Sequence, residues 1–300
     1  MPELHYDSGQ QWILNLTLAM MVLGLALDIH PRDFLKVFKA PKAPLIGLAA
    51  QFLLLPGFTC ALTLLLDLPA GIELGMILVA ACPGGALSNF ITHLSGGNTA
   101  LSISITAISS TLAVLMLPIN FMFWASLNPV ANELLLNINV SGKDIIQSLL
   151  IVLAAPLALG FLMQHFTPSL SKRLHKILKY GSLLALFMFI FMAVFNNYQH
   201  FLGQFWLLFT AVLAHNLLAM GTGFAAASIG QLPSADKKAI TLEVGMQNSS
   251  LAIAIVFTQF DAEYGMALIS AFWGMWHIVS GLIFAGVSRQ NMYKNEGAVQ

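Results

Sequence analysis

Charged residues are scarce in this chain of 300 residues. Only 9% of its side chains are charged, against about 25% in a typical soluble domain, whereas 58% are hydrophobic. A soluble core cannot hold this share of apolar side chains, so the expected surroundings of most of the chain are a lipid bilayer. The formal net charge is zero, which leaves no basic surface for nucleic acid.

Several motifs are missing as well. The two cysteines, Cys60 and Cys82, lie in apolar runs and form neither a disulfide framework nor a zinc-ligand spacing. The first ten residues lack the positive segment of a cleavable signal peptide, so the first apolar run is expected to be a membrane span. The phosphate-binding pattern GxxxxGK[ST] is absent, and no nucleophile lies with a base in a catalytic pattern. These absences argue against an enzyme.

Long apolar runs fill most of the chain. A membrane-spanning helix needs roughly 20 mostly apolar residues. Nine such runs occupy residues 11–29, 44–66, 72–94, 99–124, 144–165, 180–198, 205–229, 239–260 and 265–287. The connections are short, and the longest, around residues 126–143, is polar. We therefore expect an all-α polytopic membrane protein with nine transmembrane helices, in a single transporter domain over residues 1–300.

Basic residues lie unevenly between the predicted spans. Only Lys143 falls on one side, where acidic residues gather, and all other Lys and Arg residues fall on the opposite side. These others are Arg32, Lys36, Lys39, Lys42, Lys172, Arg173, Lys176, Lys179, Lys237, Lys238, Arg289 and Lys294. Because basic loops tend to stay in the cytoplasm, we expect the N-terminus outside the cell and the C-terminus inside it.

Two predicted spans are interrupted near their middle. Residues 82–89 read CPGGALSN, where Pro83 removes a backbone donor and the pair Gly84 and Gly85 weakens the helix. Residues 243–249 read EVGMQNS, with Gly245 at the corresponding place. Such breaks in two halves indicate a transporter binding site between inverted repeats, here spans one to four and five to nine. Pro83, Gly84 and Gly245 would be hinges, and two ordinary kinks are the alternative.

Glu243 is the only charged residue well inside a predicted span. A carboxylate at that depth costs roughly 2.5–3.5 kcal/mol on insertion scales, so it indicates an ion or proton site, or else a protonated or paired glutamate that joins helices. Ser102 and Thr106 lie four residues apart, on one helical face. With Ser88 and Asn89 they offer the oxygen ligands that a hard cation prefers, although membrane serines and threonines more often serve packing.

Four strings carry a family resemblance. CPGGALSN, GGNTALSISIT, EVGMQNSSLA and FWGMWHIVSG resemble, in this order, strings of the bile acid:sodium symporter family, over about residues 11–287. The resemblance implies a core domain and a panel domain, with the two broken helices crossing in the core. Bacterial members often have ten spans, whereas this chain resembles the nine-span animal members. It also implies a cell-membrane protein, expected in a bacterial inner membrane, that functions as a monomer.

The resemblance further implies two sodium sites and a substrate cavity. The first sodium site would comprise Ser88, Asn89, Ser102, Thr106 and Glu243. The second would comprise Glu243, Val244, Met246, Gln247 and Gln51. The substrate would contact Asn248, His277, Gly85 and Ala86, although a lone membrane histidine often only joins helices. Many members carry threonine at Ala86 and an amide at Ile278, so the identity of the anion does not carry over.

Together these features predict sodium-coupled symport of a small organic anion by alternating access, driven by an ion gradient. One rival is the same architecture driven by protons, with Glu243 as the carrier. Another is an arsenite- or auxin-type exporter of the related superfamily, with the Cys82 thiolate as a ligand, although Cys-Pro-Gly-Gly is common to the symporter motif itself. A sensor or an intramembrane enzyme would need an output domain or a catalytic dyad, and the sequence shows neither.

Overall fold

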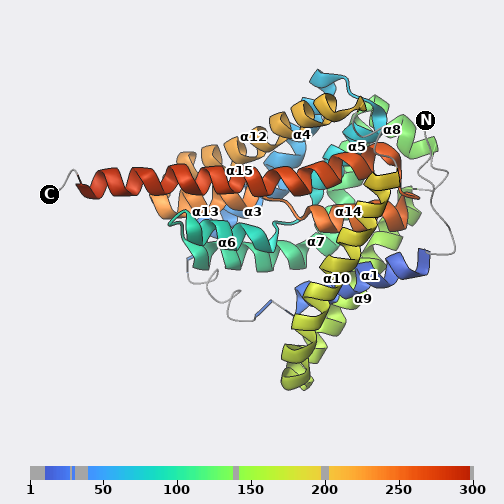
Figure 1. Ribbon diagram of the computed structural model, residues 1–300, viewed down its shortest axis with the longest axis horizontal. Helices are drawn as coiled ribbons and strands as arrows, with labels where there is room; N and C mark the ends of the chain where they lie inside the picture. The colour runs from blue at the N-terminus through green and yellow to red at the C-terminus, as the bar shows by residue number, and fades with distance from the viewer. Residues whose placement is uncertain (1–10, 28, 31–39, 138–141, 197–202, 298–300) are drawn as a thin grey trace.

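The computed structural model describes residues 11–27, 29–30, 40–137, 142–196 and 203–297, and the regular elements within them are helices (Figure 1). In chain order these are α1 (Gln11–Ala26), α3 (Lys42–Ala49), the π-helix η2 (Ala50–Leu54), α4 (Leu55–Leu66), α5 (Ala70–Ala81), α6 (Ala86–Leu94), α7 (Thr99–Leu127), α8 (Pro129–Asn137), α9 (Gly142–Phe166), α10 (Pro168–Asn196), α12 (Phe205–Ile229), α13 (Ser234–Gly245), α14 (Ser249–Gln259) and α15 (Tyr264–Gly297).

The helices follow the apolar runs. Five continuous helical stretches are long and apolar enough to cross a membrane: Lys42–Leu66, Thr99–Leu127, Ile145–Phe166, Phe205–Ile229 and Tyr264–Arg289. The interrupted runs 72–94 and 239–260 are the pairs α5–α6 and α13–α14, and the runs 11–29 and 180–198 fall largely on α1 and α10. This is the arrangement of a polytopic membrane protein, and the count of nine spans stays a prediction.

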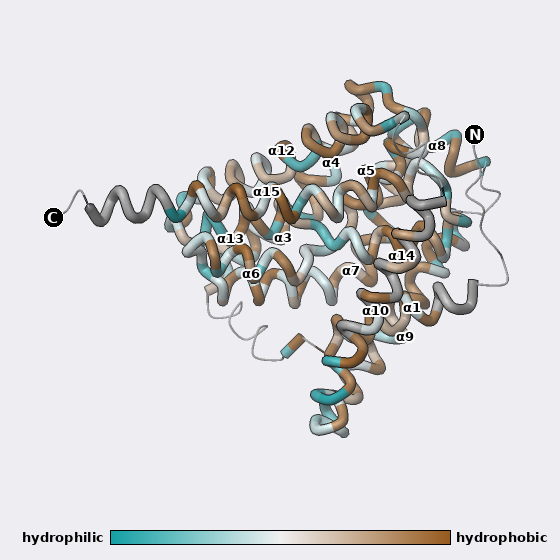
Figure 2. Tube along the Cα trace, in the orientation of Figure 1, coloured by the Kyte–Doolittle hydropathy of each residue, from teal (hydrophilic) through white to brown (hydrophobic). Residues whose placement is uncertain are grey.

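Apolar side chains also cover much of the outer surface. Leu53, Ile151 and Trp206 are more than half exposed, and Figure 2 shows hydrophobic residues along most helices, with a hydrophilic turn between α9 and α10. By contrast α5 is buried at every position from Gly71 to Ala81. A helix that is apolar all round and buried belongs to the interior of a bundle. The exposed apolar surface therefore faces lipid, while α5 lies at the centre.

Residues 126–143 differ from the prediction of a plain polar connection. They include α8, whose first turn is capped by Asn128, because the Asn128 Oδ1 accepts a hydrogen bond from the Ala131 N–H at 3.0 Å. The Asn128 Nδ2 donates to Glu73 Oε2 at 2.7 Å and to Thr63 Oγ1 at 3.0 Å. This amide therefore ties α8 to the start of α5 and to the end of α4.

Two polar side-chain bonds connect separate segments at one end of the fold. Lys238, in the first turns of α13, donates from Nζ to the Ser95 carbonyl at 2.9 Å, and Asn98 Nδ2 donates to Asp236 Oδ1 at 2.7 Å. These bonds join the α6–α7 turn to the start of α13, at the end toward which the C-terminal part of α15 points (Figure 1). Of the basic residues used to predict orientation, Arg32, Lys36 and Lys39 lie outside the described residues.

Candidate functional site

The two broken helices meet at their breaks. Helix α5 ends at Ala81 and α6 begins at Ala86, while α13 ends at Gly245 and α14 begins at Ser249. The connecting segments pair in antiparallel fashion, with Gly84 opposite Gln247. The Gly85 N–H donates to the Met246 carbonyl and the Asn248 N–H donates to the Pro83 carbonyl, both at 2.9 Å. Each segment thus satisfies backbone groups that the other lost by unwinding, as buried irregular backbone requires.

Position 84 requires glycine because the Glu243 carboxylate lies so close to it. A Cβ atom at this position would lie 2.1 Å from Glu243 Oε1, whereas a Cβ at Gly85 would meet the Met246 carbonyl at 3.4 Å. Only a residue without a side chain lets the carboxylate approach the break so closely. The requirement at position 84 is therefore space, and the predicted hinge motion at Pro83, Gly84 and Gly245 stays a prediction.

Three hydroxyl groups surround the buried carboxylate of Glu243, whose side chain has no exposed surface. Ser88 Oγ lies 2.6 Å and Ser102 Oγ 3.0 Å from Glu243 Oε2, and Thr106 Oγ1 lies 2.6 Å from Oε1. Asn89 Oδ1 completes the group, 2.7 Å from the Ser102 hydroxyl and 3.1 Å from that of Thr106. The five residues predicted for the first ion site therefore form one cluster, which we call the oxygen cage.

The three hydroxyl groups of the oxygen cage carry fewer hydrogens than they have close contacts with acceptor oxygens. Ser88 Oγ lies within 2.8 Å of two acceptor oxygens, Ser102 Oγ within 3.0 Å of two, and Thr106 Oγ1 within 3.1 Å of three. Each hydroxyl carries one hydrogen, so four of these seven contacts bring two oxygens together without a hydrogen between them. A cation among the oxygens removes that repulsion, and a hard cation takes such ligands.

Two glutamine amides face each other beside the cage. Gln51 Nε2 lies 2.6 Å from Gln247 Oε1, and Gln247 Nε2 lies 3.2 Å from Gln51 Oε1. Each amide also donates to a backbone carbonyl, Gln51 to Cys82 at 2.8 Å and Gln247 to Val244 at 2.6 Å. The structure thus brings together Gln51, Gln247 and Val244 as predicted for a second site, and adds the Cys82 carbonyl, which sequence reasoning missed.

The backbone around Gln51 is irregular. Gln51 lies in η2, a single π-helical turn within the long helix that α3 and α4 complete. Pro56 follows in the first turn of α4 and has no N–H with which to bond the carbonyl four residues earlier. Turns of this kind recur at functional sites, because the extra residue re-aims a side chain. Here the side chain that is directed toward the break is Gln51.

Asn216 is a residue of the crossover that sequence reasoning missed. Its Nδ2 donates to the Gly245 carbonyl at 2.9 Å, at the end of α13. Gln51 makes the matching contact with the Cys82 carbonyl at the end of α5. In both cases the span before a broken helix supplies an amide to the carbonyl that unwinding leaves free. The signal was available, because each freed buried carbonyl needs a donor and few amides occur in these spans.

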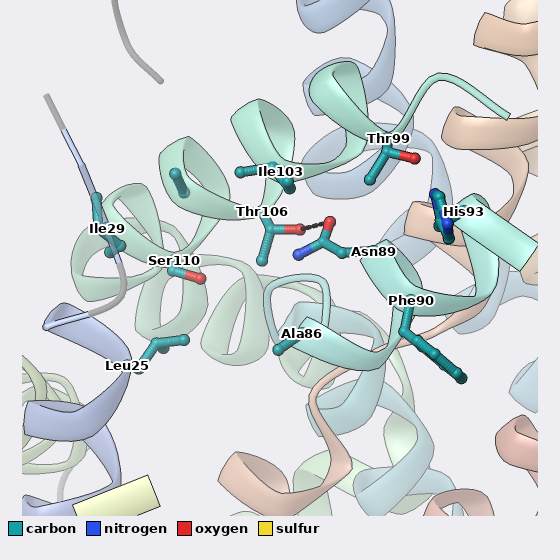
Figure 3. A pocket seen from close by; sticks show the side chains of 11 residues that line it. Leu25, Ile29, Ala86, Asn89, Phe90, His93, Thr99, Ile103, Thr106 and Ser110 are labelled. Atoms are coloured by element: carbon teal, nitrogen blue, oxygen red, sulfur yellow. Dashed lines mark hydrogen bonds between the residues drawn. The ribbon is translucent and has the colours of Figure 1, made fainter. Parts of the chain in front are cut away.

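A cavity of about 390 Å³ adjoins the oxygen cage. Figure 3 shows it between the end of α1 and the facing sides of α6 and α7. It is lined by Leu25, Ile29, Ala86, Asn89, Phe90, His93, Thr99, Ile103, Thr106, Ala107 and Ser110. Asn89 and Thr106 belong to both the cage and the cavity wall. The oxygen cage and a space of ligand size therefore share side chains.

Of the residues predicted to contact the substrate, one lines the cavity and the others make contacts elsewhere. Ala86 lines the cavity, whereas the N–H of Gly85 is already bonded to the Met246 carbonyl. The Asn248 Oδ1 caps α14 by accepting from the Leu251 N–H at 3.0 Å. His277 is buried in α15, and its Nδ1 lies 2.8 Å from the Trp273 carbonyl. Neither Asn248 nor His277 is among the residues that line this cavity, and their substrate roles stay predictions.

Known proteins resemble this chain over most of its length. A model of the sodium bile acid symporter family matches residues 15–204. The uncharacterized sodium-dependent transporter YocS of Bacillus subtilis (strain 168) is 32% identical over 278 residues, which cover 91% of this chain and 83% of that protein. The ileal sodium/bile acid cotransporter of Homo sapiens is 26% identical over 262 residues, or 84% and 70% of the two chains.

The P3 protein of Mus musculus is 28% identical over 232 residues, which are 76% of this chain and 48% of the relative, so the match spans about half of that protein. The family, YocS and the ileal cotransporter are transporters by description, and the helices are those of a multi-pass membrane protein. The protein is thus a transporter and not an enzyme, and sodium is the coupled ion that the family's description names. The chain belongs to the sodium bile acid symporter family.

Proposed function

We propose that this chain carries out sodium-coupled symport of a small organic anion by alternating access. The observation that carries the proposal is the oxygen cage around Glu243, a carboxylate with no exposed surface. An uncompensated charge at this depth costs roughly 2.5–3.5 kcal/mol on insertion scales. A sodium ion among the cage oxygens would neutralise the charge of Glu243. It would also be coordinated by the oxygens that have no hydrogen between them.

The hydrogen shortage favours a metal cation over a proton. A proton on Glu243 adds one hydrogen to the cage, whereas four close oxygen contacts lack one. A cation is coordinated by several oxygens at once, without a hydrogen in any of these contacts. We therefore assign Ser88, Asn89, Ser102 and Thr106, with Glu243, to the first sodium ion.

The paired glutamines support a second sodium ion. Gln51 and Gln247 bond to each other, to the Cys82 carbonyl at the end of α5 and to the Val244 carbonyl next to Glu243 in the chain. Met246 lies in the segment between α13 and α14 that pairs with the other break. Rotation of the two amides would turn their oxygens toward an ion that takes the place of the present amide hydrogens. Two sodium ions with one monoanion move one net positive charge, which is worth roughly 2.3 kcal/mol at 100 mV.

The first turn of α6 is the proposed seat of the anionic group. No Lys or Arg lies within any predicted span, so helix dipoles are the remaining source of positive potential. Two N–H groups at this break are already used, since Gly85 donates to the Met246 carbonyl and Ser88 donates to the Gly85 carbonyl. The N–H groups of Ala86 and Leu87 remain, as first-turn groups without an intrahelical acceptor, and Ala86 borders the cavity.

The arrangement of elements fits an inverted repeat with a core and a panel domain. The antiparallel pairing of the two breaks and the matching amides of Gln51 and Asn216 support the repeat. In Figure 1, α1, α9 and α10 lie together beside the helices that build the crossover, as a panel would. We place the protein in the cell membrane as a monomer, with the N-terminus outside and the C-terminus in the cytoplasm.

Thermal unfolding of the purified protein tests this function. Melting is compared in sodium chloride and in choline chloride at equal ionic strength, first alone and then with a panel of anions: taurocholate, pantoate and pyruvate. Sodium alone should raise the melting temperature, and at least one anion should raise it further only in sodium. That anion should then accumulate in proteoliposomes along a sodium gradient. A proton-driven carrier would instead respond to pH and not to sodium.

A further inference from the structure

One side-chain amide faces both the ion cage and the cavity. Both hydrogen bonds that Asn89 makes with the cage end on its Oδ1, from the hydroxyls of Ser102 and Thr106. Asn89 also lines the cavity. Figure 3 shows its amide nitrogen on the side of Asn89 that faces Thr106, Ala86 and Ser110. The two N–H hydrogens of this amide are therefore donors offered to the cavity.

A second polar group in the cavity wall lacks a partner. Ser110 is only 5% exposed, and its Oγ makes no hydrogen bond with any residue that the structure describes. It lies one helical turn beyond Thr106 on α7, on the same face, and lines the same cavity as Asn89. Most other serines of α7 bond to their own helix, for example Ser104 to the Ala100 carbonyl at 2.8 Å. A buried hydroxyl without a partner is costly, and rotation of the Ser110 side chain would turn this hydroxyl toward the cavity that the residue lines.

The remaining wall defines the kind of molecule that fits. Leu25, Ile29, Ile103 and Ala107 give it an apolar surface. The volume of about 390 Å³ lies within the range of about 300–1,000 Å³ of small-molecule sites. An organic anion with a compact apolar body fits this space, with its carboxylate at the first turn of α6. A neighbouring hydroxyl or oxo oxygen would lie between Asn89 and Ser110.

We propose that Asn89 and Ser110 contact the transported anion directly, and that Asn89 couples it to sodium through the two ends of one amide. The inference rests on the proposed function and names its coupling residue. Sodium bound at Oδ1 holds the amide in this orientation and polarises it, which strengthens the N–H groups offered to the anion. By linkage, the anion then tightens sodium binding by the same factor.

Asn89→Asp tests the two proposed roles of this side chain separately. The aspartate keeps an oxygen in the cage but replaces the two N–H donors with an oxygen that repels an anion. Sodium should still raise the melting temperature of this variant, and more steeply than in the wild type, because the cage gains charge. Calorimetric titration with the anion of the taurocholate, pantoate and pyruvate panel that shifts the wild type most should show at least a tenfold loss of affinity. The sodium dependence of that affinity should disappear.

Ser110→Ala provides a test that does not disturb the cage. It should weaken binding of the same anion roughly two- to tenfold, the range for one hydrogen bond, and leave the sodium response unchanged. Without anion the variant should be at least as stable as the wild type, because it loses a buried hydroxyl without a partner. Ser104→Ala is the matched control, and it should bind the anion as the wild type does. If Ser110→Ala and Asn89→Asp both bind the anion with wild-type affinity, the inference is wrong while the proposed function stands. If sodium stabilises the wild type and no anion does, the substrate class fails and the inference with it.

Discussion

Replacement of Glu243 by glutamine should give a protein whose stability no longer depends on sodium. The substitution keeps the shape of the side chain and removes the charge that both proposed sodium sites share. It also adds two N–H hydrogens to a cluster in which four close oxygen contacts lack one. The variant should therefore fold, and two of these four contacts would gain a hydrogen without an ion.

The buried charge and the bound sodium ions shift the stability of the wild type, relative to Glu243→Gln, in opposite directions. In choline the wild type carries a buried charge without its ion, so Glu243→Gln should be more stable by up to about 2.5–3.5 kcal/mol. In sodium at one hundred times its dissociation constant, each bound ion stabilises the wild type by roughly 2.7 kcal/mol, and the variant gains nothing. The difference in the free energy of unfolding should thus shrink or reverse as sodium replaces choline.

Glu73→Gln is the matched control for this experiment. Glu73 is also a buried glutamate, 1% exposed, but its oxygens accept from the Leu68 N–H and the Asn128 amide, both outside the cage. A glutamine there turns one acceptor into a donor that faces another donor, so it should cost about 1–3 kcal/mol in both buffers alike. Thermal melting of the three proteins across sodium–choline mixtures measures this. Equal sodium responses of the wild type and Glu243→Gln would refute the reasoning.

Four further substitutions test other parts of the crossover. Gly84→Ala should abolish stabilisation by sodium, because its Cβ would lie 2.1 Å from Glu243 Oε1, whereas Gly85→Ala, with contacts of 3.4 Å or more, should keep it; melting in sodium and choline compares the two. Gln51→Ala should remove one of two proposed sodium ions and lower the steepness of sodium-dependent uptake, and an unchanged Hill coefficient would count against the second site. Asn216→Leu leaves the Gly245 carbonyl without its amide donor, so chemical unfolding should show a loss of about 1–3 kcal/mol.

The fold follows from the sequence wherever one physical rule dominates. A membrane span needs about 20 apolar residues, so the apolar runs placed the helices, and the strings around Pro83 and Gly245 placed both breaks. Helix α8 escaped prediction because it is short and partly polar. Its position depends on the contacts of Asn128 with Glu73 and Thr63, which lie far apart in the sequence. The π-helical turn at Gln51 likewise leaves no periodic signal.

The candidate site was predicted only as far as its motifs reach. Side chains at motif positions, such as Ser88 and Thr106, lie together around Glu243 as expected. Asn216 and Ser110 belong to no motif, and their importance depends on tertiary structure: one faces a carbonyl freed by unwinding, and the other has no partner in a cavity wall. Such roles require a knowledge of which buried polar groups are left unsatisfied, and a sequence alone does not contain that.

Direct counting of bound sodium tests the central claim most closely. Equilibrium binding of radioactive sodium to the purified protein, in a background of choline and without any organic anion, gives the number of ions per chain. The oxygen cage and the paired glutamines predict saturable binding of two ions to the wild type, of one ion to Gln51→Ala, and of none to Glu243→Gln. Absence of saturable sodium binding by the wild type, or undiminished binding by Glu243→Gln, would contradict the account.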